Sequence, residues 1–166
     1  TGTDRLAEVA KKIKKKFYIN VQGDEPICNP LDIKKLIKYA KRSPNQIMNG
    51  YTKIKNKEMF NSPNIPKVVF DKNENLLYMS RAPIPSNKKK AFIKAWRQVC
   101  IYSFPYKCLK DFSSVKKKSL LESIEDLELN RFIEMGYKVK MLKMSDKSLA
   151  VDTVTDLRKV RKILKR

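Results

Sequence analysis

Apolar positions along the chain follow two spacings, and the switches between them predict the order of strands and helices. Short apolar or alternating runs, typical of strands, occupy residues 17–21, 47–54, 99–104 and 137–144. Apolar side chains three or four positions apart, the period of an amphipathic helix, occupy residues 3–13, 30–42, 106–112, 119–136 and 153–164. Strands that alternate with helices predict an α/β fold with a mainly parallel sheet.

Capping and turn residues locate the ends of these elements. Thr3 is expected to cap the first helix, and Asn29-Pro30 is a helix cap followed by proline at the first helical position. The stretch "DKNEN" at 71–75 lies between two apolar runs and predicts an inserted antiparallel hairpin. The longest helix starts at Ser119 and ends near Gly136, because glycine is favoured at helix C-caps. The apolar face of the first helix is expected at Leu6, Val9, Ala10 and Ile13.

Length and composition indicate one soluble globular domain, residues 1–166. With 42% hydrophobic and 33% charged residues, the chain can bury a core and is not of the disordered class. No apolar run approaches the ~20 residues that cross a bilayer, and the start has no signal-peptide pattern. Three widely spaced cysteines, Cys28, Cys100 and Cys108, are typical of reduced thiols. We therefore expect a cytoplasmic protein without a membrane partner.

Two features of the composition narrow the chemistry. The chain contains no histidine, which excludes Ser-His-Asp triads, Cys-His dyads and histidine-ligated zinc. Catalysis would then use carboxylates, lysines, arginines, hydroxyls or a hard metal ion bound by oxygen. The net charge of +21 attracts anionic ligands, but the lysines are scattered and no nucleic-acid-binding motif is present. We therefore expect a nucleotide ligand rather than a nucleic-acid partner.

The end of the first predicted strand carries unusual chemistry. In "FYINVQGDEPICNP", the apolar run 17–21 is followed at once by Gln22, Gly23, Asp24 and Glu25. One interpretation is a polar turn, since Gly-Asp is good turn chemistry. The other is a ligand site at the carboxyl edge of a sheet, where open α/β folds bind their ligands. Both interpretations stay open on these residues, and the turn is the simpler one.

Further stretches carry a family resemblance. In sequence order they are "TGTDRLAEV" (1–9), "INVQGDEP" (19–26), "LLYMSRAPIP" (76–85) and "AVDTVTDLRKV" (150–160). Together they resemble the 3-deoxy-manno-octulosonate (Kdo) cytidylyltransferases, also called CMP-Kdo synthetases, and "LESIEDLELNRFIEMG" is similar to a helix of that family. The resemblance implies a three-layer, Rossmann-like nucleotidyltransferase fold. It also implies transfer of CMP from CTP to Kdo with release of pyrophosphate, dependence on magnesium (Mg2+), a homodimer, and a place in lipopolysaccharide or capsule biosynthesis.

One part of the family pattern is missing. The family begins with a strand and a loop of the type "IPAR--S-RLP-K", whose Arg and Lys hold the triphosphate. No such stretch occurs in these 166 residues. We therefore expect this chain to be the C-terminal part of a longer nucleotidyltransferase, with the N-terminal strand and loop missing. A catalytically inert fragment that acts as a binding module is the alternative of another class.

The resemblance assigns the metal and nucleotide residues. Asp24 in "VQGDEP" and Asp152 in "VDT" match the family's two metal-binding aspartates, and they are the catalytic candidates. The nucleotide side would be formed by residues from two segments: Thr3, Arg5, Gln22, Gly23 and Asp24. From the residues themselves, a plain helix N-cap is the simpler interpretation of Asp152. For Thr3, Arg5 and Gly23 the alternatives are a helix cap, a surface cation and a turn glycine.

The resemblance also assigns the sugar side, to four residues from three segments: Arg81, Gln98, Tyr102 and Glu128. Arg81 is the candidate for the sugar carboxylate, because a planar guanidinium forms paired hydrogen bonds with a carboxylate. Without the resemblance, these four are ordinary surface, strand and helix residues.

Departures from the family pattern leave the acceptor open. Gln98 stands where the family has a histidine, Cys100 where it has a glycine, and Leu129 where it has a glutamine. A site built on buried hydrogen bonds discriminates strongly when one bond is lost. Kdo is the first expectation, and an acylneuraminate-type or other Kdo-like sugar acid, such as an amino-substituted one, is the alternative.

Overall fold

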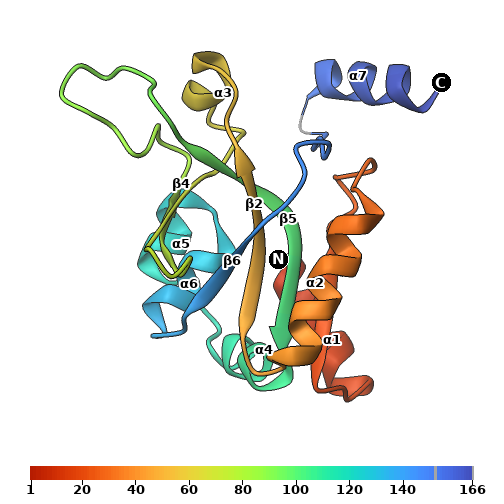
Figure 1. Cartoon of the computed structure of the whole chain (residues 1–166). Coiled ribbons are helices and arrows are strands. Elements are labelled where there is room, and N and C mark those ends of the chain that lie inside the picture. The colour runs from red at the N-terminus through yellow and green to blue at the C-terminus, as the bar shows by residue number, and fades with distance from the viewer. Residues whose placement is uncertain (152, 166) are drawn as a thin grey trace.

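The computed structural model describes residues 1–151 and 153–165, and its centre is a six-stranded sheet (Figure 1). The strands are β1 (Phe17–Val21), β2 (Ile47–Lys53), β3 (Lys67–Phe70), β4 (Leu76–Ser80), β5 (Trp96–Pro105) and β6 (Val139–Lys143). The helices are α1 (Gly2–Lys12), α2 (Pro30–Arg42), α3 (Lys57–Asn61), α4 (Tyr106–Ser114), α5 (Leu120–Glu125), α6 (Glu128–Glu134) and α7 (Val154–Leu164). The predicted α/β class and the inserted β3–β4 hairpin are confirmed.

The sheet is mixed, with more antiparallel pairing than the sequence predicted. β5 pairs antiparallel with β1, β2 and β3, and β3 pairs antiparallel with β4, while β2 and β6 are parallel. The inserted hairpin is the reason. After the hairpin, the chain returns through the middle of the sheet as β5, which runs opposite to β1 and β2. β1, β2 and β6 nevertheless share one direction, so their carboxyl ends lie at the same edge.

Helices cover both faces of this sheet. On one face, α1, α4 and α6 pack on the strands, and Leu109, Phe112 and Phe132 in this layer are fully buried. On the other face, Leu36 and Ala40 of α2 pack against β2, β5 and β6. Both clusters draw on β5, because successive strand side chains point to opposite faces. The result is the three-layer arrangement expected from the resemblance.

The first helix differs from the prediction in its cap and in its buried face. Thr1, not Thr3, is the N-cap of α1. Ala7 and Ala10 are buried, whereas Val9 and Ile13 are 46% and 56% exposed. Small side chains face inward because α1 packs closely on α4. Of the predicted face, Ala10 is buried and Leu6 packs against the core, whereas Val9 and Ile13 lie outside.

The predicted helix 119–136 is two helices. Asp126 adopts a left-handed conformation with φ 51° between α5 and α6, a conformation that Asp tolerates better than most residues. The break turns Glu122 of α5 toward Arg131 of α6, and the two form an ion pair in which both side chains are buried. The C-cap of α6 is Met135, and Gly136 follows it with φ 80°, the left-handed position after a helix end at which glycine is favoured. Within the residues described, no helix has the length and apolar character needed to cross a membrane.

Candidate active site

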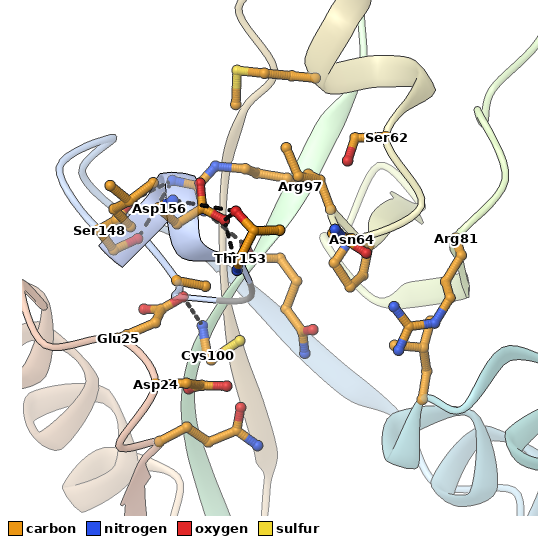
Figure 2. A pocket seen from close by; sticks show the side chains of 18 of the residues that line it. Asp24, Glu25, Ser62, Asn64, Arg81, Arg97, Cys100, Ser148, Thr153 and Asp156 are labelled. Atoms are coloured by element: carbon orange, nitrogen blue, oxygen red, sulfur yellow. Dashed lines mark hydrogen bonds between the residues drawn. The ribbon is translucent and has the colours of Figure 1, made fainter. Parts of the chain in front are cut away.

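A cleft of about 810 Å³ opens at the sheet edge where β1, β2 and β6 end (Figure 2). Its lining comes from the segments that follow these three strands, from β5, from the residues before β3 and at the end of β4, and from α3, α6 and α7. Segments distant in sequence meet here because the three strands run in the same direction. Open α/β sheets bind ligands at this kind of edge.

The floor of the cleft is a gap in the sheet beside β5. β1 pairs with the second half of β5 and β3 with its first two residues, and Gln98 and Cys100 between them line the cleft. Backbone bonds hold both rims of the gap. Gln98 N–H donates to the carbonyl of Pro66 at 3.0 Å, and Gln22 N–H donates to that of Cys100 at 3.3 Å.

The motif after β1 exposes one carboxylate and buries the next. Asp24 is exposed, lines the cleft, and has no side-chain hydrogen bond to a described residue. Glu25 is 3% exposed; its Oε1 accepts the backbone N–H of Cys100 at 3.1 Å, and its Oε2 has no partner among the described residues. Burial raises the pKa of Glu25, against the opposing effects of the Cys100 N–H and of nearby Arg97. The motif is therefore a turn that also forms part of the cleft.

The segment after β6 is tied to this motif. The backbone N–H of Val151 donates to the carbonyl oxygen of Asp24 at 2.9 Å. Asp152, the second predicted metal ligand, follows Val151 in the sequence and lies outside the described residues. The N-cap of α7 is Thr153, whose hydroxyl accepts the backbone N–H of Asp156. No cluster of three or more His, Cys, Asp or Glu side chains that could hold a metal occurs in the described residues, so the metal site stays a prediction.

The predicted nucleotide residues surround the same motif. Gln22 and Asp24 line the main cleft, and with Arg5 and Gly23 they also line an adjacent shallow pocket of about 460 Å³. Thr3 lines the main cleft but is 2% exposed, and its hydroxyl is bonded to the first residue of α6. A Cβ at Gly23 would meet no atom within 4 Å, so no contact within the protein requires glycine there. The structure brings these residues together, and their roles stay predictions.

Arg81, predicted to bind the sugar carboxylate, lines the cleft with part of its guanidinium already engaged. It donates to the backbone carbonyls of Glu125 at 2.7 Å, Pro63 at 3.0 Å and Asp126 at 3.4 Å. The ammonium of Lys67, a fully buried lysine, donates to the carbonyl of Arg81 itself. Because a guanidinium carries five N–H donors, two N–H groups of Arg81 have no partner among the described residues.

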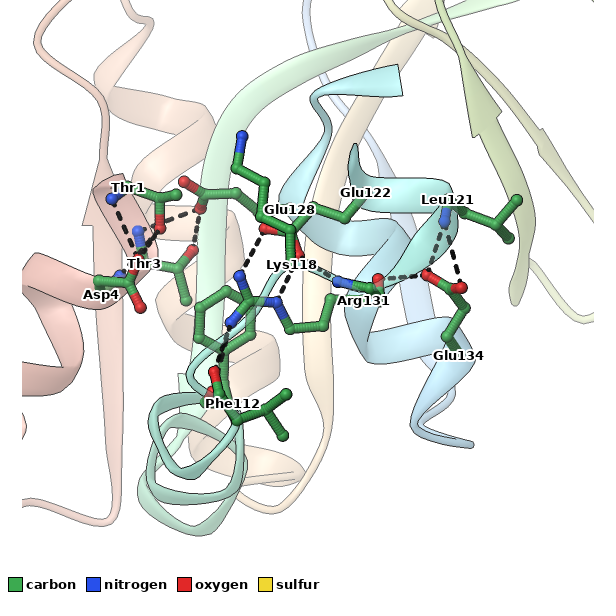
Figure 3. A network of polar contacts seen from close by, with 12 residues as sticks. Thr1, Thr3, Asp4, Phe112, Lys118, Leu121, Glu122, Glu128, Arg131 and Glu134 are labelled. Carbon is green, nitrogen blue, oxygen red and sulfur yellow. Dashed lines mark hydrogen bonds and ion pairs between the residues drawn. The ribbon is translucent and has the colours of Figure 1, made fainter. Parts of the chain in front are cut away.

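Glu128, also predicted on the sugar side, is bonded to the start of α1 (Figure 3). It accepts the backbone N–H of Gly2 at 2.9 Å and that of Thr3 at 3.0 Å. A carboxylate at a helix N-terminus satisfies N–H groups that have no partner within the helix. Glu128 therefore fixes α1 against α6 at the rim of the cleft.

Gln98 and Tyr102 form a hydrogen bond on the floor. Gln98 Nε2 donates to the Tyr102 hydroxyl at 3.0 Å, and the two residues are 6% and 7% exposed. Burial raises the pKa of Tyr102 well above its ordinary value, so the hydroxyl keeps its proton at neutral pH. Leu129, which replaces the family's glutamine, is buried and lines the same cleft.

The sequence interpretation missed Arg97, which links β5 to the segment after β6. Its guanidinium donates to the carbonyl oxygen of Ser148 at 2.8 Å. Burial lowers the pKa of Arg97, and the charge of Glu25 opposes that shift. The sequence does contain a signal for Arg97, which is a charged residue next to an apolar strand in "RQVCIY". A charged side chain that is buried there needs polar partners. An exposed ion pair, Lys55–Asp146 at 2.7 Å, is a second link to the same segment.

Comparisons with known proteins agree with this geometry. The model of the family "Cytidylyltransferase" matches residues 1–144. A 3-deoxy-manno-octulosonate cytidylyltransferase of Flavobacterium johnsoniae is 33% identical over 99% of this chain and 69% of its own length. One of Geotalea uraniireducens is 37% identical over 100% of this chain and 70% of its own length. An 8-amino-3,8-dideoxy-manno-octulosonate cytidylyltransferase of Shewanella halifaxensis is 32% identical over 95% and 66%.

A solved structure supports the same assignment. The structure of a CMP:2-keto-3-deoxy-manno-octonic acid synthetase complexed with CTP superposes with a TM-score of 0.88 and 31% identity, covering 99% of this chain and 68% of the other. A putative glucose-1-phosphate thymidylyltransferase from Bacillus anthracis, at TM-score 0.66 and 12% identity, shares the fold. The chain belongs to the cytidylyltransferase family, among the 3-deoxy-manno-octulosonate cytidylyltransferases.

Proposed function

We propose that the protein containing this chain transfers CMP from CTP to a sugar acid of the Kdo type and releases pyrophosphate. The observation that carries the proposal is the meeting of the "QGDEP" motif with the segment ending at Val151 at one cleft, in a chain whose relatives are named for this reaction. The cleft volume of about 810 Å³ lies in the range usual for small-molecule sites.

The chemistry asks the chain mainly to position two substrates. A hydroxyl oxygen of the sugar acid loses its proton to solvent and bonds to the α-phosphorus of CTP, and the bond from that phosphorus to pyrophosphate breaks. Holding the two in line removes much of the entropic cost of their meeting. Gln98 and Tyr102 on the floor would hold sugar hydroxyls, and the two remaining N–H groups of Arg81 would hold the sugar carboxylate.

We further propose that Asp24 and Asp152 hold Mg2+. Asp24 fits this role because its carboxylate is exposed in the cleft and is not bonded to any described residue. Mg2+ takes one or two protein carboxylates and completes its shell with phosphates and water. Glu25 is a poor ligand because its free oxygen is enclosed. When bound, the ion supplies positive charge that stabilises phosphate oxygens.

Pyrophosphate release by the full-length gene product, with CTP, Mg2+ and Kdo, tests the proposal. Asp24→Asn should lower kcat/KM by about 100-fold or more. The amide would hold Mg2+ less well than the carboxylate, and the phosphate oxygens would lose the several kcal/mol of stabilisation that the ion supplies. Glu8→Gln is the matched control, since Glu8 is an exposed carboxylate on α1 away from the cleft. Absence of pyrophosphate release with every sugar acid tried would reject the proposed function. Salt-sensitive retention on heparin, without a thermal shift by CTP, would instead support the inert binding module.

An amino-substituted acceptor is a second candidate. The relative from Shewanella halifaxensis is named for an 8-amino sugar acid, and Gln98 and Leu129 change the floor of the cleft from the pattern of the family. Turnover of Kdo, its 8-amino analogue and N-acetylneuraminate in the same assay separates the candidates, because the acceptor with the highest kcat/KM identifies the substrate class.

We also propose a cytoplasmic homodimer that serves lipopolysaccharide or capsule biosynthesis. The dimer rests on the family resemblance, and we choose the β3–β4 hairpin for the test because Leu77 on β4 is apolar and 58% exposed. Light scattering of the full-length protein should give twice the monomer mass, and Leu77→Lys should shift it toward the monomer. A monomer at micromolar concentration would contradict this part of the proposal.

A further inference from the structure

A buried amide on β2 controls which atom Gln98 presents to the cleft. Asn49 is fully buried, at the point where the register between β2 and β5 shifts. Its Nδ2 donates to the carbonyl of Val99 at 3.0 Å and to that of Ile101 at 3.0 Å. Both N–H groups are thereby used, and the opposite orientation would set Oδ1 against two carbonyl oxygens. Asn49 must therefore present Oδ1 on its other side.

The orientation of Asn49 determines that of Gln98. Gln98 Nε2 donates to Asn49 Oδ1 at 3.3 Å and to the Tyr102 hydroxyl at 3.0 Å. A rotated Gln98 would place its oxygen against Asn49 Oδ1, which cannot donate. Gln98 therefore spends both N–H groups on the protein, and Oε1 is the atom left for a ligand.

Gln98 Oε1 opens on the cleft. It has no hydrogen bond to a described residue. In the described part of the chain, the fully enclosed side-chain atoms that lack a partner are Glu25 Oε2, Ser103 Oγ and Asn130 Oδ1. Gln98 Oε1 is not one of them, so it is not fully enclosed by the protein. Because Gln98 lines the cleft, this oxygen is a fixed acceptor on the floor. Relatives that carry histidine at this position, as the resemblance implies, have a ring that can donate or accept.

We propose that Asn49 is a positioning residue that fixes Gln98 as a hydrogen-bond acceptor for a hydroxyl or amino group of the bound sugar acid. The inference rests on the proposed function and adds the selection of the acceptor. A sugar acid that lacks a donor at this point leaves Gln98 Oε1 unpaired in a buried site. An unpaired buried polar group costs enough to lower kcat/KM about 10- to 100-fold.

The test is acceptor discrimination in the full-length enzyme, measured as the ratio of kcat/KM for the preferred sugar acid to that for each of its monodeoxy or deamino analogues. The wild type should reject one analogue by about 10- to 100-fold. Asn49→Leu and the milder Asn49→Ser, whose hydroxyl can still serve one of the two carbonyls, should both reduce this ratio. The KM for CTP should stay within about twofold, since Asn49 does not line the cleft. Ser103→Ala, another buried polar residue of the sheet, should keep the wild-type ratio.

A double-mutant cycle separates positioning from a structural role. If Asn49 acts through Gln98, then Asn49→Ser should cause no further loss of discrimination in a Gln98→Met background, because coupled residues are not additive. Additive losses, or a wild-type ratio in both Asn49 variants, would overturn the inference while leaving the proposed function intact. Absence of wild-type turnover with any sugar acid would overturn both.

Discussion

The two walls of the cleft are built differently. The hairpin wall (residues 62–81 and 119–134) is held by side chains that satisfy one another. Glu125 accepts the hydroxyls of Tyr78 and Ser80 and the backbone N–H of Arg81, and Glu122 pairs with Arg131 out of contact with water. The loop wall (residues 145–151 and 153–159) faces it across the cleft.

The loop wall is attached to the rest of the molecule by fewer buried groups. The buried part of its attachment includes the bond from Arg97 to the carbonyl of Ser148, the bond from Val151 to the carbonyl of Asp24, and the bonds from the backbone N–H and hydroxyl of Ser145 to the buried carboxylate of Asp32. Its Lys55–Asp146 ion pair is exposed on both sides, and exposed pairs contribute little. The hairpin wall is thus preformed by bonds within it, whereas the position of the loop wall depends on single contacts with β5, with the "QGDEP" motif and with Asp32 of α2. Local stability should differ accordingly.

The largest effect should come from breaking the buried ion pair of the hairpin wall. Glu122→Gln leaves the Arg131 guanidinium buried without a counter-charge, and such losses cost about 3–5 kcal/mol. Arg131 also stacks on Phe112, with 3.7 Å from the guanidinium carbon to the ring centre, so it cannot turn outward to water. Urea denaturation should show a lower midpoint with an unchanged slope.

The exposed pair Lys118–Asp126 is the control for that measurement. Lys118 and Asp126 are 43% and 70% exposed, so Lys118→Ala should leave the urea midpoint where it is. A midpoint for Glu122→Gln equal to that of the control would mean that the hairpin wall is not stabilised by this pair.

The next effect should come from Arg97→Gln, which weakens the attachment of the loop wall. Glu25 then loses its neighbouring cation and the Ser148 carbonyl loses a charged donor, so we expect a stability loss of about 1–3 kcal/mol. The activity loss should be on the order of 10- to 100-fold, the usual cost of removing a supporting group around a metal site, because Arg97 holds Ser148 in the segment that precedes the proposed ligand Asp152 in the sequence. Hydrogen exchange should increase in residues 145–151 more than in α5 and α6. Equal increases in both walls would contradict the comparison.

A smaller, pH-dependent effect should come from Lys67 in the hairpin wall. Burial lowers the pKa of Lys67 to about 8 from an ordinary 10.5. Below pH 8 the buried charge is a constant penalty; between pH 8 and 10.5 the folded protein releases the proton before the unfolded chain does, so stability rises with pH. The free energy of unfolding of the wild type minus that of Lys67→Met should therefore increase over this window. The control is Lys89→Met, because Lys89 is exposed, and the free energy of the wild type minus that of this variant should not change with pH. A falling difference for Lys67→Met would show that the charged form is favoured.

The sequence predicted helices well where a helical spacing of apolar residues was accompanied by capping residues at the helix end. Asn29-Pro30 starts α2 and Gly136 follows α6 as expected. The single helix 119–136 was wrong because the apolar period continues across Asp126, whereas the chain breaks there in a left-handed conformation and Glu122 pairs with Arg131 across the break, a contact that the apolar period does not reveal. The face of α1 was right for Leu6 and Ala10 and wrong for Val9 and Ile13, since close packing selects the small Ala7 over Val9.

The site was predictable in its location and less so in its hydrogen bonding. The resemblance located the "QGDEP" motif, and the shared direction of β1, β2 and β6 explains why it lines a cleft. The partners of Arg81 and Glu128 come from residues 44 and 125 positions away in the sequence, so no local pattern contains them. Asn49 was missed because a buried asparagine in a strand gives no signal until its neighbours on β5 are known.

The smallest effect should come from the cap of α7 and should stay within the loop wall. Thr153→Ala removes the hydroxyl that accepts the N–H of Asp156, and losing such a cap costs about 1 kcal/mol. If the loop wall opens independently of the sheet, hydrogen exchange should accelerate in residues 154–164 while the midpoint of global unfolding does not move. Thr155→Ala is the matched control, because Thr155 also lines the cleft in the first turn of α7 and is not its cap. A lower global midpoint for Thr153→Ala, absent in the control, would mean that α7 unfolds together with the sheet, and the two walls would then belong to one cooperative unit.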